Sequence, residues 1–153
     1  MIEIYKNIYV GSSDDFGQYP FGRDWALVNA CKELEISKNT LSEKVLLEDY
    51  LFLNTDSNKQ LKFFDIETMQ LVFSFVQAKL QNGKNVFIFC DLGGSASPLV
   101  LILFLSIRMQ VLPDTSFEDA EDVFYDVYVD YNPKPEMRQE AQKLWHDFNN
   151  KSK

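Results

Sequence analysis

The residues best suited to chemistry in this sequence lie in one short stretch, FCDLGGSASP, at positions 89–98. Cys90 follows the run VFIF, which is typical of a buried strand, and the residues after Pro98 form an apolar run with a helical pattern. A loop that leaves a strand and enters a helix directs successive backbone N–H groups at one point, where the helix N-terminus adds partial positive charge. The thiolate of a cysteine at the base of such a loop would be stabilised and could attack an electrophile such as a phosphoryl group. The pattern therefore predicts an anion site with Cys90 as its candidate nucleophile.

The same stretch lacks the cation that an anion site usually carries. No Arg or Lys occurs between Lys84 and Arg108. A purely structural interpretation is also open, because free cysteines are usually buried and because Ser95 or Ser97 would cap a helix with or without a ligand. The loop thus has the shape of an anion site without a charged side chain to hold the anion.

The loop resembles the signature loop of the cysteine-dependent protein tyrosine phosphatases, and above all that of the small dual-specificity phosphatases. The shared pattern is strand–Cys–x2–Gly–x–Ser–x–Ser–helix, with Cys90, Gly93 and Ser97 in the matching places. The similarity continues in collinear order over residues 2–148, through IYVGSSDDF, ALVNACKEL and the NPKP turn. We therefore expect the fold of this family.

That resemblance implies an α/β fold of the dual-specificity phosphatase type, with a single central, mostly parallel sheet flanked by helices. The domain would occupy residues 1–149, and residues 150–153 would be a frayed tail. Alternating apolar strands and amphipathic helices in the sequence agree with one α/β domain. The polar segment KELEISKNTLSEKV is predicted to be a loop, and a helix over residues 66–81 is predicted to begin at an Asp65 cap.

The resemblance also assigns roles to individual residues. Hydrolysis would proceed through a phosphocysteine on Cys90, without a metal or another cofactor, and Ser97 would support the cysteine as it leaves. Asp56 would be the general acid, although it can equally be a surface carboxylate, and Asp65 is the alternative acid. The phosphate-binding loop would consist of Asp91, Leu92, Gly93, Gly94, Ser95 and Ala96.

Two departures from the family pattern decide the prediction of function. Ala96 stands where the family has an Arg that forks onto two phosphate oxygens, and Phe89 stands where it has a His. The loss of a guanidinium that stabilises the transition state costs about 10³–10⁵ in rate in comparable cases. Asp91 adds a like charge beside the thiolate and the phosphate. The sequence therefore predicts a pseudophosphatase, a phosphatase fold with weak or absent turnover.

Three classes of function remain open for such a chain. A binding module would shield phosphorylated partners, and its binding would survive Cys90→Ser. A slow phosphatase, with a cation supplied by Arg23 or Arg108 from elsewhere in the fold, would lose its turnover in that variant. A purely structural interaction protein would show neither property. Phe89 and Ala96 could also be engineered changes in an active parent.

A hydrolase of another kind is the remaining alternative. GGSAS resembles the G-x-S-x-G nucleophile elbow, with Ser95 as the nucleophile and His146, the single histidine, as the last member of a triad. However, the final glycine of that elbow is Ser97 here, and the chain is short for a hydrolase sheet. One histidine and two distant cysteines also give no legible zinc or haem site.

Composition limits the partners and the compartment. The chain has 153 residues, a net charge of −8 and only two cysteines, Cys31 and Cys90. The negative charge argues against nucleic acid and anionic membranes as partners, and two distant cysteines indicate a reducing compartment. Cys31 follows an apolar strand and is expected to pack in the core. We expect a monomeric, cytoplasmic protein whose partner is a phosphoprotein or another protein.

Overall fold

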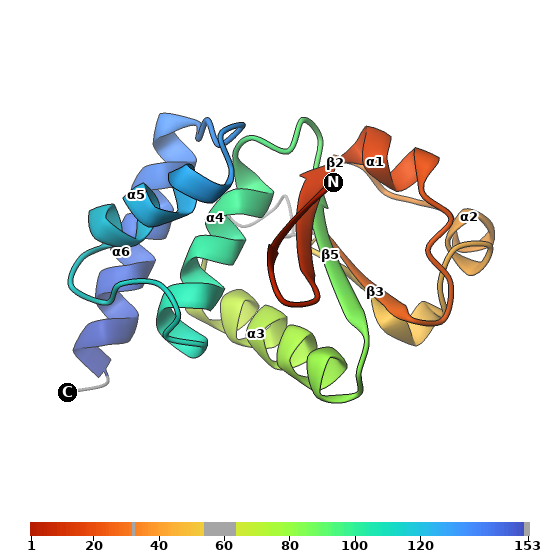
Figure 1. Cartoon of the computed structure of the whole chain (residues 1–153), viewed down its shortest axis with the longest axis horizontal. Coiled ribbons are helices and arrows are strands. Elements are labelled where there is room, and N and C mark those ends of the chain that lie inside the picture. The colour runs from red at the N-terminus through yellow and green to blue at the C-terminus, as the bar shows by residue number, and fades with distance from the viewer. Residues whose placement is uncertain (32, 54–63, 152–153) are drawn as a thin grey trace.

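A five-stranded sheet forms the centre of the molecule (Figure 1). The computed structural model describes residues 1–31, 33–53 and 64–151, with side chains through residue 149. The strands are β1 (Ile2–Tyr5), β2 (Ile8–Ser12), β3 (Trp25–Asn29), β4 (Tyr50–Phe52) and β5 (Asn85–Cys90). Their order is β1-β2-β5-β3-β4; β1 is antiparallel to β2, and the other pairs are parallel. The predicted mostly parallel sheet is confirmed.

Helices cover both faces of this sheet (Figure 1). They are α1 (Ser13–Gln18), α2 (Lys38–Ser42), α3 (Ile66–Gln81), α4 (Ala96–Leu103), α5 (Phe117–Val127) and α6 (Pro135–Lys151), with a 3₁₀ turn η1 (Leu47–Asp49) and a π-helical turn η2 (Phe104–Arg108). The helices α3 to α6 lie on one side and α1 and α2 on the other. Within the described residues, no helix has the length and apolar character needed to cross a membrane.

Helix ends follow local capping chemistry. The Asp65 side chain accepts a hydrogen bond from the backbone N–H of Thr68, so the predicted cap of α3 is confirmed. The polar segment that the sequence predicts as a loop contains the short helix α2, and this prediction is wrong there. Ser37 caps that helix, but Leu41 is its single buried residue, so the sequence has no apolar periodicity from which the helix could be predicted. The last helix continues to Lys151, and the domain boundary at 149 stays a prediction.

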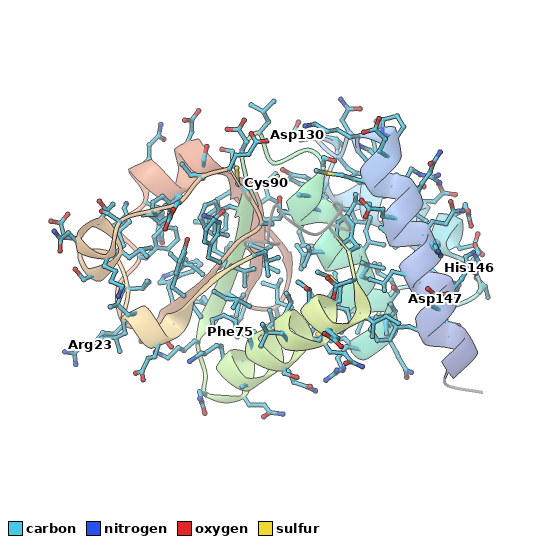
Figure 2. All side chains as sticks on the ribbon, turned by 180° about the vertical axis from the view of Figure 1, so that it is seen from behind. Arg23, Phe75, Cys90, Asp130, His146 and Asp147 are labelled. Carbon is cyan, nitrogen blue, oxygen red and sulfur yellow. The ribbon has the colours of Figure 1, made fainter. Side chains whose placement is uncertain are left out.

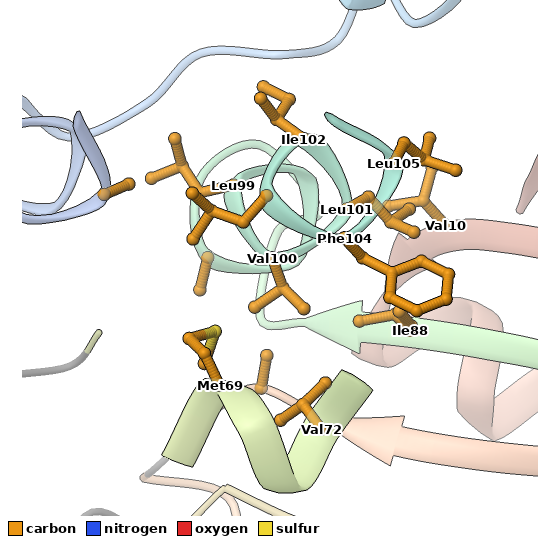
Figure 3. Close-up of a cluster of buried hydrophobic side chains, with 14 of the residues drawn as sticks. Val10, Met69, Val72, Ile88, Leu99, Val100, Leu101, Ile102, Phe104 and Leu105 are labelled. Carbon is orange, nitrogen blue, oxygen red and sulfur yellow. The ribbon is translucent and has the colours of Figure 1, made fainter. Parts of the chain in front are cut away.

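The main core fixes the start of α4, and with it the loop that precedes it. Every residue of α4 is buried, as its apolar sequence predicts. Figure 3 shows this helix packed between Met69 and Val72 of α3 and the strand residues Val10 and Ile88. Because the helix contacts neighbours on all sides, its N-terminus is held against the carboxyl ends of β2 and β5. That end of the sheet is where ligands bind in open α/β folds.

Candidate functional site

Cys90 lies at the carboxyl end of β5, at the base of the loop that leads into α4. Its side chain is nearly buried, and its Sγ lies 3.1 Å from the Oγ of Ser97 in the first turn of α4. The Ser97 hydroxyl is also 3.4 Å from the backbone oxygen of Gly11 on β2, to which it donates. The structure thus brings together two of the three residues to which the sequence analysis gave catalytic roles.

The loop takes its conformation from a glycine that no other residue could replace without strain. Gly93 has φ +79°, in the left-handed region. A Cβ at this position would lie 2.9 Å from the backbone carbon of Gly11 and 3.0 Å from the hydroxyl of Tyr128. The backbone turn and the close approach of β2 therefore both require glycine.

A second segment, residues 128–134 between α5 and α6, holds the loop from outside; we call it the connector. The Tyr128 hydroxyl donates to the Gly93 carbonyl (2.7 Å), and the connector's backbone at Asn132 donates to the Gly94 carbonyl (2.7 Å). The backbone N–H of Lys134 donates to the Ser95 hydroxyl (2.9 Å). Burial, followed by the nearby Asp130, raises the pKa of Tyr128 to about 12, so its hydroxyl keeps the proton that it donates. The connector thus ties down the carbonyl oxygens of the loop.

The N–H groups of the loop, in contrast, are free to meet a ligand. Among the described residues, no atom accepts a hydrogen bond from the backbone N–H groups of residues 92–96. Ser95 is the N-cap of α4 by position, but its side chain makes no capping bond; its hydroxyl accepts from the Lys134 N–H and donates to the sulfur of Met137 (3.3 Å). A helix N-terminus with open N–H groups is an anion site in physical terms.

A cavity of about 500 Å³ opens over this loop. Cys90 and Ala96 line it, and so does Cys31, which follows β3. Its charged lining residues are Glu33, Asp91, Asp130 and Lys134. Figure 2 shows Cys90 and Asp130 at the same end of the molecule. In the part of the chain that the structure describes, three carboxylates against one ammonium make the lining acidic, which opposes the loop's attraction for an anion.

Ala96 and Phe89 occupy their positions as packing residues. Ala96 is 5% exposed and presents only a methyl group to the cavity. Phe89 is completely buried and stacks on Phe16 (ring centroids 5.1 Å apart) and Phe87 (5.3 Å). The position before the cysteine is therefore part of an aromatic cluster beneath α1, where it offers no hydrogen bond to the loop.

Several residues named from the sequence lie away from this cavity. Arg23 and His146 lie at other parts of the surface (Figure 2). Arg108 donates to Gln77 and stacks over an aromatic ring of the core. Asp65 caps α3, and Asp56 falls outside the described residues. Neither arginine lines the cavity, so neither can supply the missing cation in this structure.

The sequence analysis missed several residues of the site. Lys134 and Tyr128 come from the connector, where only the NPKP turn marked a rigid segment near the end of the chain. Cys31 packs against the core as expected, but it also lines the cavity, and burial raises the pKa of its thiol. Within the described residues, no group of three or more His, Cys, Asp or Glu side chains could hold a metal ion.

Comparisons with solved structures identify the fold. Human DUSP28 superimposes with a TM-score of 0.72 at 14% identity, over 97% of this chain and 94% of that one. A leucine rich repeat and phosphatase domain containing protein from Entamoeba histolytica gives 0.68 at 15% identity, over 99% and 94%. Human tyrosine phosphatase-like serine/threonine/tyrosine-interacting protein gives 0.67 at 14% identity, over 96% of each chain. No protein-family model and no curated protein matches the sequence. The chain therefore has the fold of the dual-specificity phosphatases, as its signature loop predicted.

Proposed function

We propose that this phosphatase-fold protein is a pseudophosphatase that binds a phosphorylated protein through the loop at Cys90 and turns it over weakly or not at all. One observation carries the proposal. The cavity keeps the open N–H groups of an anion site, but the buried methyl group of Ala96 stands where a guanidinium would be needed. Such a site can hold a phosphoryl group without stabilising its transfer.

Weak turnover follows from what the two substitutions remove. An Arg at position 96 would follow the phosphoryl oxygens into the transition state, and comparable losses cost about 10³–10⁵ in rate. Phe89 leaves the loop without the orienting side chain that the resemblance places before the cysteine. Asp91, directly after Cys90, accepts a hydrogen bond from the Ser13 hydroxyl and keeps a carboxylate beside the loop. All three features oppose a reaction that builds negative charge at this point.

A protein partner is favoured by the rim of the cavity. Leu92 lines it with 86% of its surface exposed, and Val129, beside the lining residue Asp130, is 69% exposed. Large apolar side chains that are exposed beside a cavity suit contact with a protein surface. The acidic lining favours weak, salt-sensitive binding of phosphate, so contacts at the rim would supply part of the affinity.

Slow turnover is the second candidate, and the contact between Cys90 and Ser97 favours it. The 3.1 Å separation of Sγ and Oγ keeps a hydroxyl in place to support a departing thiolate. The acid that this mechanism requires would be Asp56, which lies outside the described residues. The two candidates differ in a single measurable property, turnover that depends on Cys90.

The test compares the protein with its Cys90→Ser variant. We expect hydrolysis of 4-nitrophenyl phosphate to be equal in the two proteins, while a phosphotyrosyl peptide binds both more tightly than its unphosphorylated form. Turnover that falls at least tenfold in Cys90→Ser would establish the slow phosphatase instead. Equal binding of the phosphorylated and unphosphorylated peptides would refute phosphate recognition altogether.

A gain-of-function variant provides the matched control. The double variant Phe89→His/Ala96→Arg restores both side chains of the family pattern. We expect Cys90-dependent turnover to rise in it, provided that a thermal melt shows a folded protein. The thermal melt is needed because both positions are buried, so a variant that misfolds would also show no turnover.

A further inference from the structure

We propose that Lys134 is the cation of this anion site, so that the positive charge comes from the connector and not from the loop. The inference rests on the function proposed above and names the residue that makes phosphate binding possible. In the described part of the chain, Lys134 is the single Lys or Arg among the lining residues of the cavity.

The backbone of Lys134 is fixed beside the loop. Its N–H donates to the Ser95 hydroxyl over 2.9 Å, next to the first turn of α4. Pro133 and Pro135 flank it, and a proline that follows a residue restricts that residue to extended conformations. The NPKP segment, which the sequence analysis treated only as a turn, therefore holds the backbone of Lys134 rigidly beside the cavity that this residue lines.

The ammonium group has no competing partner among the residues that the structure describes. The ion pairs found there join Met1 to Asp15, Lys79 and Lys84 to Asp49, and Arg138 to Glu121. Glu33, Asp91 and Asp130 line the same cavity, yet none is paired with Lys134. A cation that lines an acidic cavity without an ion pair is available to a ligand.

The position of Lys134 also explains binding without turnover. An ammonium group is a point charge on a flexible stem and lacks the planar fork that holds two phosphoryl oxygens in the transition state. The Lys134 ammonium would attract a bound phosphoryl group to a similar extent in the ground state and in the transition state. Interactions of equal strength in the ground state and the transition state improve binding but do not accelerate chemistry.

Electrostatics predicts a large effect from this one side chain. Among the described residues, every charged group that lines the cavity other than Lys134 is a carboxylate. Removal of the ammonium should therefore weaken phosphate binding about tenfold at low ionic strength, in the range expected for a charge-assisted hydrogen bond. The difference should shrink as salt is added, because the site is open to solvent.

The experiment titrates phenyl phosphate into four proteins at low salt, with binding followed by amide shifts in NMR spectra. These are the unaltered protein, Lys134→Gln, Lys134→Arg and Lys143→Gln. Lys143 is an exposed lysine on α6 that does not line the cavity, so it controls for the change in net charge. We expect about a tenfold loss in Lys134→Gln, a loss of less than threefold in Lys134→Arg, and no change beyond twofold in Lys143→Gln.

The outcomes separate this inference from the proposed function. If the unaltered protein binds phenyl phosphate and Lys134→Gln binds it equally well, Lys134 is not the cation, while phosphate recognition stands. Equal losses in Lys134→Gln and Lys143→Gln would show an effect of net charge alone and would also overturn the inference. If the unaltered protein shows no shifts at the loop, the proposed function fails and the inference fails with it.

Discussion

The two ends of β5 differ in whether their charged groups are paired. At the amino end, the buried carboxylate of Asp49 accepts from Lys79 (2.8 Å) and Lys84 (2.6 Å), and Lys84 also donates to the Arg23 carbonyl. At the carboxyl end, open N–H groups, three carboxylates and Lys134 share a cavity, and no ion pair joins these groups among the residues that the structure describes. The charges of the first cluster are paired with one another, whereas the polar groups of the second are available to bind a ligand.

This contrast separates a structural role from a functional one. A buried, fully paired charge has no capacity for a further partner, and removal of one of its partners is strongly destabilising because it leaves an uncompensated charge. Unpaired polar groups around a cavity lack such partners and remain available to bind a ligand. The difference predicts that substitutions at the amino end change the free energy of unfolding, while those at the carboxyl end change phosphate affinity.

The largest effect is expected from Gly93→Ala, which changes both quantities. A positive φ and a Cβ 2.9 Å from the backbone of Gly11 should together lower the free energy of unfolding by about 4 kcal/mol. Gly83→Ala is the matched control, because its φ is +80° and no atom lies within 4 Å of the added Cβ. Urea denaturation should give a loss of about 1.5 kcal/mol for this control, from backbone strain alone. Equal losses would show that β2 does not constrain the loop.

The second-largest effect is expected from Asp49→Asn, which should lower the free energy of unfolding by about 3 kcal/mol and leave phosphate affinity unchanged. The neutral amide would leave two ammonium groups without their common partner, although both keep some contact with solvent. Asp24→Asn, at an exposed carboxylate near the same end of the sheet, should change stability by less than about 0.5 kcal/mol. A parallel fall in phosphate affinity would show that the two ends of β5 are coupled.

Acid should remove the stabilisation at the amino end. Burial by itself would raise the pKa of Asp49, but hydrogen bonds from Lys79 and Lys84 outweigh it and hold the pKa below 3.8. A carboxyl with a lowered folded-state pKa stabilises the protein fully above its unfolded pKa and loses that contribution as the pH falls through the folded value. The stability difference between the unaltered protein and Asp49→Asn should therefore narrow as the pH drops below about 4. A difference that stays constant down to pH 2 would contradict this assignment.

The smallest effect is expected from Asp130→Asn at the rim of the cavity. Removal of one exposed carboxylate should tighten the binding of phenyl phosphate about twofold at low salt, because less like charge faces the anion. Asp147→Asn on α6 lies away from Cys90 (Figure 2) and should leave the affinity unchanged. Tighter binding in both variants would point to net charge and not to the cavity.

Much of the fold could be predicted because its signals are local in the sequence. The apolar run of β5, the mostly apolar α4 and the cap at Asp65 each depend on residues within one or two turns. The short helix α2 could not be predicted, because it buries a single side chain and its sequence has no apolar periodicity. The cysteine loop was predicted from its spacing and from its resemblance to a phosphatase loop.

The sequence by itself determined the strand, the cysteine, the glycine turn and the helix that follows, because these form one continuous stretch, residues 85–103. It also determined that no guanidinium comes from the loop. Only the tertiary structure decided which distant groups complete the site. Tyr128 and Lys134 reach it because α4 and α6 pack together and carry the connector over the loop. Such contacts depend on packing between segments some forty residues apart, which no local pattern encodes.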